Sequence, residues 1–124
     1  IRVAIETDYV VMDDIFISSA KTLCVPYYSN EIIDEWTGLV PLTGVKTPGI
    51  QFVHPDRAGQ GFGQQMLEFL IELARCTQLT ELKLDSSINA LGFYAKNGFV
   101  EVGRGRYETQ NGTLLESVKM RLTL

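Results

Sequence analysis

The stretch VHPDRAGQGFGQQML, residues 53–67, decides the fold because it leads from an extended apolar segment through three alternating glycines into a helix. Gly59, Gly61 and Gly63 stand where that helix is expected to begin. The first N–H groups of a helix lack intrahelical partners, and the helix dipole places about half a positive charge beside them. Glycines there leave the backbone accessible and can adopt positive φ. The stretch therefore predicts either a phosphate-binding loop or a tight turn between a strand and a helix.

Two familiar phosphate-binding loops do not fit these residues. A P-loop has Lys and then Ser or Thr after its last glycine, whereas Gly63 is followed by Gln64 and Gln65. The dinucleotide-binding fingerprint has a glycine where this chain has Gln64, and it starts directly at the end of a strand, but here residues 54–58 intervene. Asp85 imitates the acidic residue that binds ribose in that fold, so dinucleotide binding stays as a weak alternative.

The residues before the loop alternate between strand and helix patterns. Four elements are predicted there: a strand in residues 1–5, a helix from Tyr9 to Leu23, a second helix capped by Ser29 or Asn30, and a strand at residues 50–53. Between the second helix and that strand, residues 37–49 contain Gly38, Pro41, Gly44, Pro48 and Gly49. This segment therefore holds one short strand at most.

The residues after the loop predict a helix, a strand, a short helix and a hairpin. The expected ranges are Gly61 to about Gln78 for the helix, residues 79–85 for the strand, and residues 89–97 for the short helix. Asn97-Gly98 is a natural left-handed end for the short helix, and Asn111-Gly112 suits a type I′ turn in the hairpin.

This order of elements predicts a mixed α/β fold. A helix crosses over between the strands at residues 50–53 and 79–85, so the middle of the sheet should be parallel, and the hairpin makes its end antiparallel. The chain has 124 residues, 45% of them hydrophobic, which is enough for the core of a single domain at residues 1–124.

The composition excludes some partners and predicts a cellular location. Eleven Lys and Arg against fifteen Asp and Glu give a net charge of −4 without a block of like charge, so we expect neither nucleic acid nor a membrane surface as a partner. Cys24 and Cys76 lack metal-site or redox spacing and are expected to be reduced thiols in the core. With no apolar run long enough to cross a bilayer and no leader pattern, we expect a cytoplasmic protein.

Two motifs resemble one known family. VHPDRAGQGFGQQML resembles the acyl-CoA pyrophosphate loop of the GCN5-related N-acetyltransferases (GNAT). LDSSINALGFYAKNGF, residues 84–99, resembles the second signature of that family, in which an Asn follows a strand and a Phe-Tyr pair precedes Gly-Phe. The resemblance covers residues 50–124 well, and residues 1–36 are similar to the family's opening strand and two helices.

The chain departs from the family pattern in two places. Ala58 stands where the family usually has Arg or Gln, and Arg57 lies one residue too early. The family also has two antiparallel strands, some thirty residues or more, before the strand that corresponds to residues 50–53. This chain offers only residues 37–49 for them. The resemblance therefore implies a mixed sheet with helices on both faces and leaves three alternatives before Ile50. Either the sheet is abbreviated, or a hairpin is absent from the given sequence, or GLVPLTGV, residues 38–45, is its remnant.

The resemblance implies a set of residues that bind acetyl-CoA. The pantetheine arm would pair with the main chain of one strand, the diphosphate would lie on the amides of the glycine loop, and an Asn would bind the pantetheine or cap the short helix. The implied cofactor-binding residues are Phe52, Val53, Ala58, Gly59, Gly61, Gly63, Gln64 and Asn89. No metal is implied.

The resemblance also implies how acetyl transfer proceeds. The Val53 N–H would polarise the thioester carbonyl, and Tyr94 would protonate the departing thiolate, although a tyrosine beside Phe93 also suits the core. Asp85, with Ser86 and Ser87 beside it, is a weak candidate for a water-mediated proton relay. His54 is expected to be an ordinary loop residue, because nothing in the spacing supplies a partner to orient it.

Two functions remain open from the sequence. The first is an N-acetyltransferase that moves an acetyl group from acetyl-CoA to a primary amine of a small molecule or a peptide amino terminus, by direct attack in a ternary complex. The second is a non-catalytic binding or assembly domain whose exposed sheet edge would pair with a second subunit to form a homodimer. Trp36 and its neighbouring aromatics either line an acceptor site or pack in the core. The sequence does not identify the acceptor.

Overall fold

The computed structural model describes residues 5–38, 53–108 and 112–124. The chain divides into two compact units, Ile1–Met66 and Leu67–Leu124. Its elements are η1 (Glu6–Asp8), α1 (Tyr9–Leu23), α2 (Asn30–Gly38), η2 (Pro55–Arg57), α4 (Phe62–Cys76), β1 (Glu81–Ser87), η3 (Ile88–Ala90), α5 (Leu91–Lys96), β2 (Val100–Glu108) and β3 (Leu114–Thr123). Helix α4 begins in the first unit and continues in the second. Across the described ranges no helix is both long and apolar enough to cross a bilayer.

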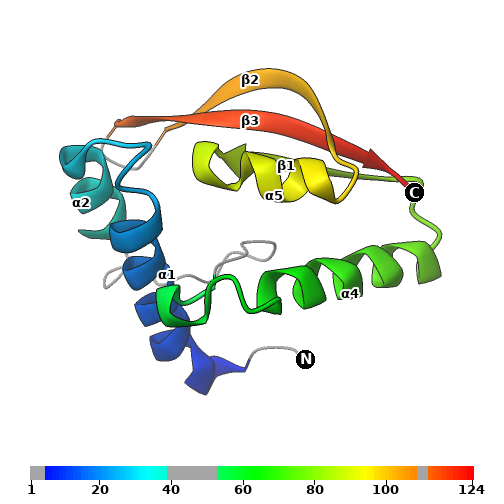
Figure 1. Cartoon of the computed structure of the whole chain (residues 1–124), viewed down its shortest axis with the longest axis horizontal. Coiled ribbons are helices and arrows are strands. Elements are labelled where there is room, and N and C mark those ends of the chain that lie inside the picture. Colours follow the sequence, from blue (N-terminus) through cyan, green and yellow to red (C-terminus); the bar gives the residue numbers. More distant parts are fainter. Residues whose placement is uncertain (1–4, 39–52, 109–111) are drawn as a thin grey trace. The chain divides into compact units, whose positions relative to one another are not determined.

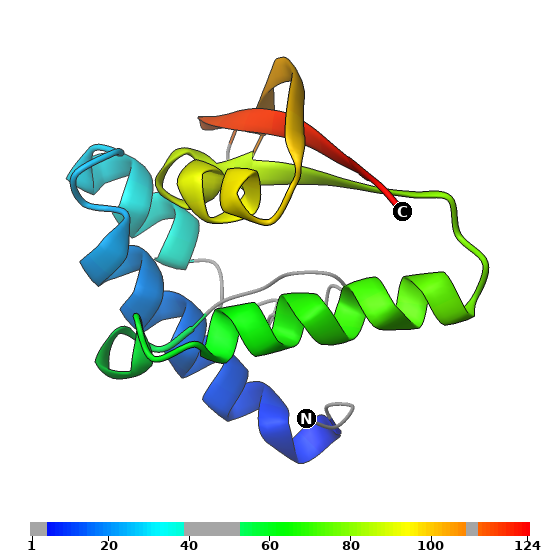
Figure 2. The same ribbon diagram turned by 45° about the vertical axis from the view of Figure 1, so that its right-hand side comes forward.

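The first unit is built on the helices α1 and α2, which lie side by side (Figures 1 and 2). Ala20 and Cys24 at the end of α1 are buried together with Ile33 of α2, and Tyr28 packs against them from the connecting turn. The Ser29 hydroxyl accepts a hydrogen bond from the Ile32 N–H at 3.3 Å, which is the N-cap that the sequence predicts. The predicted helix from Tyr9 to Leu23 is confirmed.

The predicted strands of the first unit fall largely outside the described residues. Residues 1–4 and 50–52 belong to the undescribed ranges, and so does most of the broken segment at 37–49. Val53 is described and lies in an irregular, half-buried stretch before η2. The parallel pairing of residues 50–53 with residues 79–85, the helices on both faces and the single domain therefore stay predictions.

The second unit contains a three-stranded sheet with the order β1-β3-β2, in which both pairings are antiparallel (Figure 1). Leu84 pairs with Met120 and Ser86 with Val118, so these side chains share one face. Val118 and Met120 are buried with Leu67 of α4 and Phe99, and side chains of α5 pack against this cluster. The mixed α/β class is confirmed, and its antiparallel end is observed directly.

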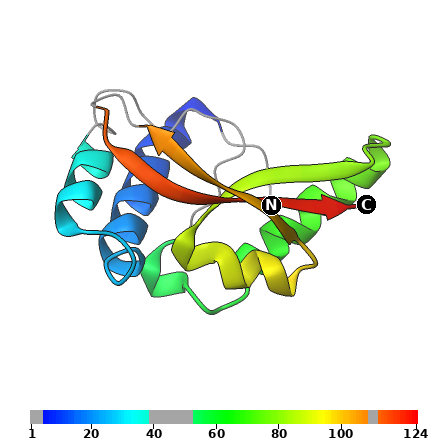
Figure 3. The ribbon, with the colours of Figure 1, turned by 90° about the horizontal axis from the view of Figure 1, so that it is seen from above.

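The C-terminal hairpin forms as predicted. β2 and β3 pair from Val100 with Arg121 to Glu108 with Leu114, and the two long strands twist across each other when viewed from above (Figure 3). Gly112 after β2 has φ +82°, which a glycine adopts without strain. Asn111 lies outside the described residues, so the predicted type I′ turn stays a prediction.

The two cysteines have different surroundings. Cys24 is buried as predicted, and burial raises the pKa of its thiol. Cys76 is exposed, so its predicted place in the core is wrong. Leu67, Ile71 and Ala74 form the inward face of α4 at helical spacing, and Cys76 falls on the other side of the helix. Both are thiols rather than disulfides.

Replacing Gly98 tests the end of α5. Gly98 has φ +88°, and a Cβ there would lie 3.3 Å from Leu122 Cδ1, so we expect Gly98→Ala to lower the free energy of unfolding by about 1 to 2 kcal/mol. Gly92→Ala is the matched control, because a Cβ at this α5 residue meets nothing within 4 Å. It should raise stability by up to about 1 kcal/mol. Urea unfolding of both variants measures the difference in their free energies of unfolding. Equal stabilities would contradict the left-handed conformation of Gly98 at the end of α5.

Candidate functional site

The candidate site starts with the short helix η2, whose backbone donors are all satisfied locally. Pro55 has no N–H, the Asp56 N–H donates to His54 Nδ1 at 3.2 Å, and the Arg57 N–H donates to the His54 carbonyl at 2.8 Å. The Ala58 N–H then donates to the Pro55 carbonyl at 3.1 Å. His54 therefore caps η2 with both its side chain and its main chain.

The glycine loop follows η2 and leads into α4. Gly59 has φ +74° and Gly61 has φ +87°, and a Cβ added at either residue would meet no heavy atom within 4 Å. The Gln65 N–H donates to the Gly61 carbonyl at 3.0 Å, so the helical bonds begin there. Gly63 is the second residue of α4 and lacks the positive φ of the other two. The predicted strand-to-helix turn is therefore a loop with open space beside its backbone.

The predicted cofactor-binding residues fall into several places. Residues 58–64 lie together in the glycine loop and the first turn of α4, and Val53 lies just before η2. Ala58 and Arg57 are both exposed, and Ala58 ends η2 in an extended conformation. Phe52 and the side chain of Trp36 lie outside the described part of the chain. Asn89 and Tyr94 belong to the second unit.

Tyr94 lies on α5 among aromatic rings. Its ring is 5.1 Å from that of Phe93 and 5.5 Å from that of Phe99, both in edge-on arrangements. Burial raises the pKa of the Tyr94 hydroxyl, because the phenolate would lose hydration. The side chain is only half-buried, so it combines a packed ring with a hydroxyl that stays protonated well above neutral pH.

Residues near the end of β1 differ from their predicted roles. Asn89 lies inside η3, and the N-cap residue of α5 is Ala90, so the prediction that Asn89 caps the short helix is wrong. Asp85 accepts a hydrogen bond from Lys119 Nζ at 3.1 Å on the exposed face of the sheet. Ser86 is fully buried, and its hydroxyl donates to the Ser87 carbonyl at 2.8 Å.

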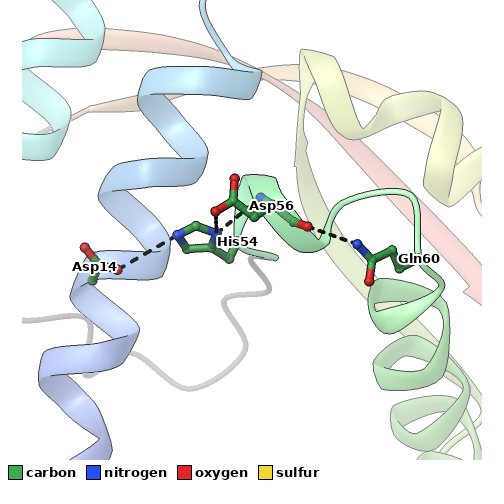
Figure 4. Close-up of polar contacts among 4 residues, drawn as sticks. All are labelled: Asp14, His54, Asp56 and Gln60. Atoms are coloured by element: carbon green, nitrogen blue, oxygen red, sulfur yellow. Dashed lines mark hydrogen bonds and ion pairs between the residues drawn. The ribbon is translucent and has the colours of Figure 1, made fainter.

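The arrangement around His54 was missed by the sequence reasoning. His54 Nε2 lies 4.0 Å from Asp14 Oδ2 of α1, and its Nδ1 lies 3.8 Å from Asp56 Oδ2 (Figure 4). The spacing His-Pro-Asp could have indicated the contact with Asp56, but nothing in the sequence relates Asp14 to it. Among the residues that the structure describes, no group of His, Cys, Asp and Glu could hold a metal ion.

A comparison with protein families decides the assignment. The model of an acetyltransferase (GNAT) domain matches residues 20–101, about two thirds of the chain, including the glycine loop and Tyr94. The chain belongs to the GNAT acetyltransferase family. The family resemblance predicted from the two motifs is thereby confirmed.

Among sequence relatives of this GNAT chain is the peptidyl-lysine N-acetyltransferase YjaB of Salmonella typhimurium. The two are 36% identical over 75 residues, which make up 60% of this chain and 50% of that protein. The chain therefore spans about half the length of the curated relative that it matches.

Solved structures support the same fold. The GCN5-related N-acetyltransferase from Rhodopseudomonas palustris termed Aminotransferase, Class-II is 25% identical, with a TM-score of 0.89 over 99% of this chain and 94% of that chain. PaiA N-acetyltransferase from Thermoplasma acidophilum, solved with coenzyme A, is 15% identical, with a TM-score of 0.68 over 99% of this chain and 97% of that chain. The first pair of chains matches over nearly the whole length of both.

The raised pKa of Tyr94 predicts how stability depends on pH. An unfolded tyrosine loses its proton near pH ~10, and the folded Tyr94 loses it at higher pH. Its contribution to stability is therefore fully present below the unfolded pKa and is lost as the pH rises through the folded pKa. We expect urea unfolding to show a steeper loss of stability above pH 10 for the native chain than for Tyr94→Phe. Equal pH profiles for the two proteins would contradict the raised pKa.

Proposed function

We propose that this GNAT chain transfers an acetyl group from acetyl-CoA to a primary amine by direct attack in a ternary complex. The observation that carries the proposal is the glycine loop, where Gly59 and Gly61 hold positive φ beside open space at the start of α4. Family membership makes coenzyme A the expected ligand of such a loop. The PaiA structure with coenzyme A supports the same choice.

The loop fits a diphosphate. Side chains at residues 59 and 61 would occupy the space beside the backbone, and glycine leaves it open. The helix dipole of α4 adds a favourable potential for an anion at the same end. The main chain of residues 59–64 would hold the diphosphate, with Ala58 beside it, since the Ala58 N–H is already bound to the Pro55 carbonyl. Val53 and Phe52 would pair with the pantetheine arm, and Asn89 would bind its amide groups.

Acetyl-CoA would supply an activated thioester, and two groups of the chain would act on it. The Val53 N–H would stabilise the carbonyl oxygen as it gains negative charge, an effect worth roughly 3 kcal/mol for one donor. Tyr94 would give its hydroxyl proton to the thiolate as the carbon–sulfur bond breaks and the carbon–nitrogen bond forms. Its raised pKa keeps that proton in place at neutral pH.

The acceptor is proposed to be a cationic primary amine that attacks after losing a proton. The Salmonella relative carries the name of a peptidyl-lysine N-acetyltransferase, and the lysine side chain is such an amine. Residues 5–38 are acidic and contain a single basic side chain, Lys21, beside Glu6, Asp8, Asp13, Asp14, Glu31, Asp34 and Glu35. This excess of negative charge favours the approach of a cation. A panel of lysine peptides, amino-terminal peptides and small diamines would separate these acceptors.

Substitution in the glycine loop tests the diphosphate site. We expect Gly61→Ala to weaken coenzyme A binding at least about tenfold in calorimetry, because the methyl group fills the open space and the backbone must leave positive φ. Gly112→Ala is the matched control for backbone strain, since Gly112 has a similar φ of +82° but lies outside the loop. It should bind coenzyme A like the native chain. If both variants bind equally well, the loop does not hold the diphosphate.

Removal of one hydroxyl tests the proposed acid. Tyr94→Phe keeps the ring that packs beside Phe93 and Phe99, so coenzyme A affinity and thermal stability should change little. We expect turnover with an amine acceptor to fall roughly 100-fold or more, the usual size of a general-acid contribution. Release of the coenzyme A thiol measures turnover, and unchanged turnover would remove Tyr94 from the mechanism.

The same measurements separate an enzyme from the binding domain that the sequence left open. A chain that binds coenzyme A tightly but releases no thiol with any amine of the panel would be a catalytically degenerate GNAT domain. The departure at Ala58 is the feature that would favour this outcome.

A further inference from the structure

His54 contacts two elements of the first unit, η2 and α1, through its imidazole ring. Nδ1 accepts the hydrogen bond of the Asp56 N–H at 3.2 Å, and Nε2 faces Asp14 Oδ2 of α1 at 4.0 Å (Figure 4). An imidazole nitrogen that accepts a backbone N–H carries no proton, so the neutral ring has its proton on Nε2. This tautomer also points its N–H toward the Asp14 carboxylate.

The peptide groups of Asp56 are held from two sides. Its N–H is bound by His54, and its carbonyl accepts a hydrogen bond from Gln60 Nε2 at 3.0 Å (Figure 4). Gln60 lies between Gly59 and Gly61, so its side chain ties the glycine loop back to η2. A continuous series of contacts thus runs from the imidazole through η2 into the loop.

Two features argue against His54 as a proton acceptor for the amine. Nδ1 already accepts the Asp56 N–H, and Nε2 carries the proton, so the neutral ring offers no lone pair without breaking the cap of η2. A base that used Nδ1 would also have to break the hydrogen bond to the Asp56 N–H in every turnover. The hydrogen bond of Nδ1 therefore suits a structural role for the ring at the start of η2.

We propose that His54 is a positioning residue that orders the diphosphate loop of residues 58–64 through the backbone of Asp56. This inference rests on the proposed function of that loop. A loop that is ordered before binding loses less conformational entropy when the ligand arrives. Loss of the Nδ1 acceptor should therefore weaken acetyl-CoA binding and leave the chemical step unchanged.

The contact with Asp14 contributes less than the hydrogen bond to Asp56. The distance of 4.0 Å is too long for a hydrogen bond, and the Asp14 side chain is 72% exposed. Ion pairs with such exposure contribute little to stability. The hydrogen bond from the Asp56 N–H is therefore the main contact that fixes the ring, and Asp14 is a weak neighbour of Nε2.

A pair of substitutions at His54 tests the proposal. His54→Leu removes the acceptor, whereas His54→Asn keeps an oxygen at the same distance from Cβ as Nδ1, and Asn is among the best capping residues. We expect His54→Leu to raise the KM for acetyl-CoA roughly fivefold with kcat unchanged, the effect of one lost capping bond, and His54→Asn to stay within about twofold of the native chain. Asp14→Asn should also leave the KM for acetyl-CoA within about twofold of the native value.

Three outcomes would overturn the proposal. Equal KM values for His54→Leu and His54→Asn would show that the acceptor atom does not matter. A fall in kcat without a change in KM would make His54 a catalytic group instead. A loss in Asp14→Asn as large as that in His54→Leu would place the effect in the contact with α1.

Hydrogen exchange of the Asp56 amide gives a readout that does not depend on coenzyme A. The amide should be protected in the native chain and in His54→Asn, and it should exchange faster in His54→Leu. If the native chain does not bind coenzyme A but shows this pattern, the proposed function fails while His54 still holds η2. If the native chain binds coenzyme A and the amide exchanges equally in all variants, the positioning role fails alone.

Discussion

The candidate site depends on a backbone constraint at Gly59 and Gly61. The chain leaves η2 and must present main-chain N–H groups at the start of α4, and it does so with φ +74° and φ +87°. L-residues pay roughly 1–2 kcal/mol to adopt left-handed φ, whereas glycine adopts it readily. The same absence of side chains that permits the turn also leaves space beside the backbone. The turn and the proposed ligand site therefore place the same demand on these two residues, which explains why one motif predicts both.

In the second unit, Tyr94 is packed among aromatic rings and keeps its hydroxyl proton. The rings of Phe93 and Phe99 fix the Tyr94 side chain, and the removal of water that accompanies this packing raises the pKa of its hydroxyl. The packing of the Tyr94 ring is thus observed, and the same contacts are compatible with the proposed role of its hydroxyl as an acid.

Local patterns in the sequence predict most of the helices and strands. They do not show which residues far apart in the sequence come into contact. Apolar spacing placed α1, α4 and the C-terminal hairpin, and Asn97-Gly98 ended α5 as predicted. The prediction for Cys76 was wrong because an apolar composition does not show which side of α4 a residue faces. The predicted strand at residues 79–85 ends two residues too early, because β1 continues its pairing with β3 as far as Ser87 and Ser117. The contact of His54 with Asp14 joins residues forty apart and leaves no trace in local spacing.

The hydrogen bonds around His54 matter more for the proposed diphosphate site because the chain has Ala58 where the family usually has Arg or Gln. A family member with Arg or Gln at this place can bind the diphosphate with a side chain, and that contact tolerates some motion of the loop because a long side chain can follow the ligand. With Ala58, the proposed diphosphate site lacks that side chain and would depend more on main-chain N–H groups, which can meet phosphate oxygens only when the loop has a suitable shape. The affinity of such a site for coenzyme A would then depend strongly on how well the loop is ordered before binding. The Asp56 N–H donates to His54, and Gln60 donates to the Asp56 carbonyl. These two hydrogen bonds fix the backbone just before the loop and within it. They would therefore order the loop in the place of the side-chain contact that Ala58 lacks.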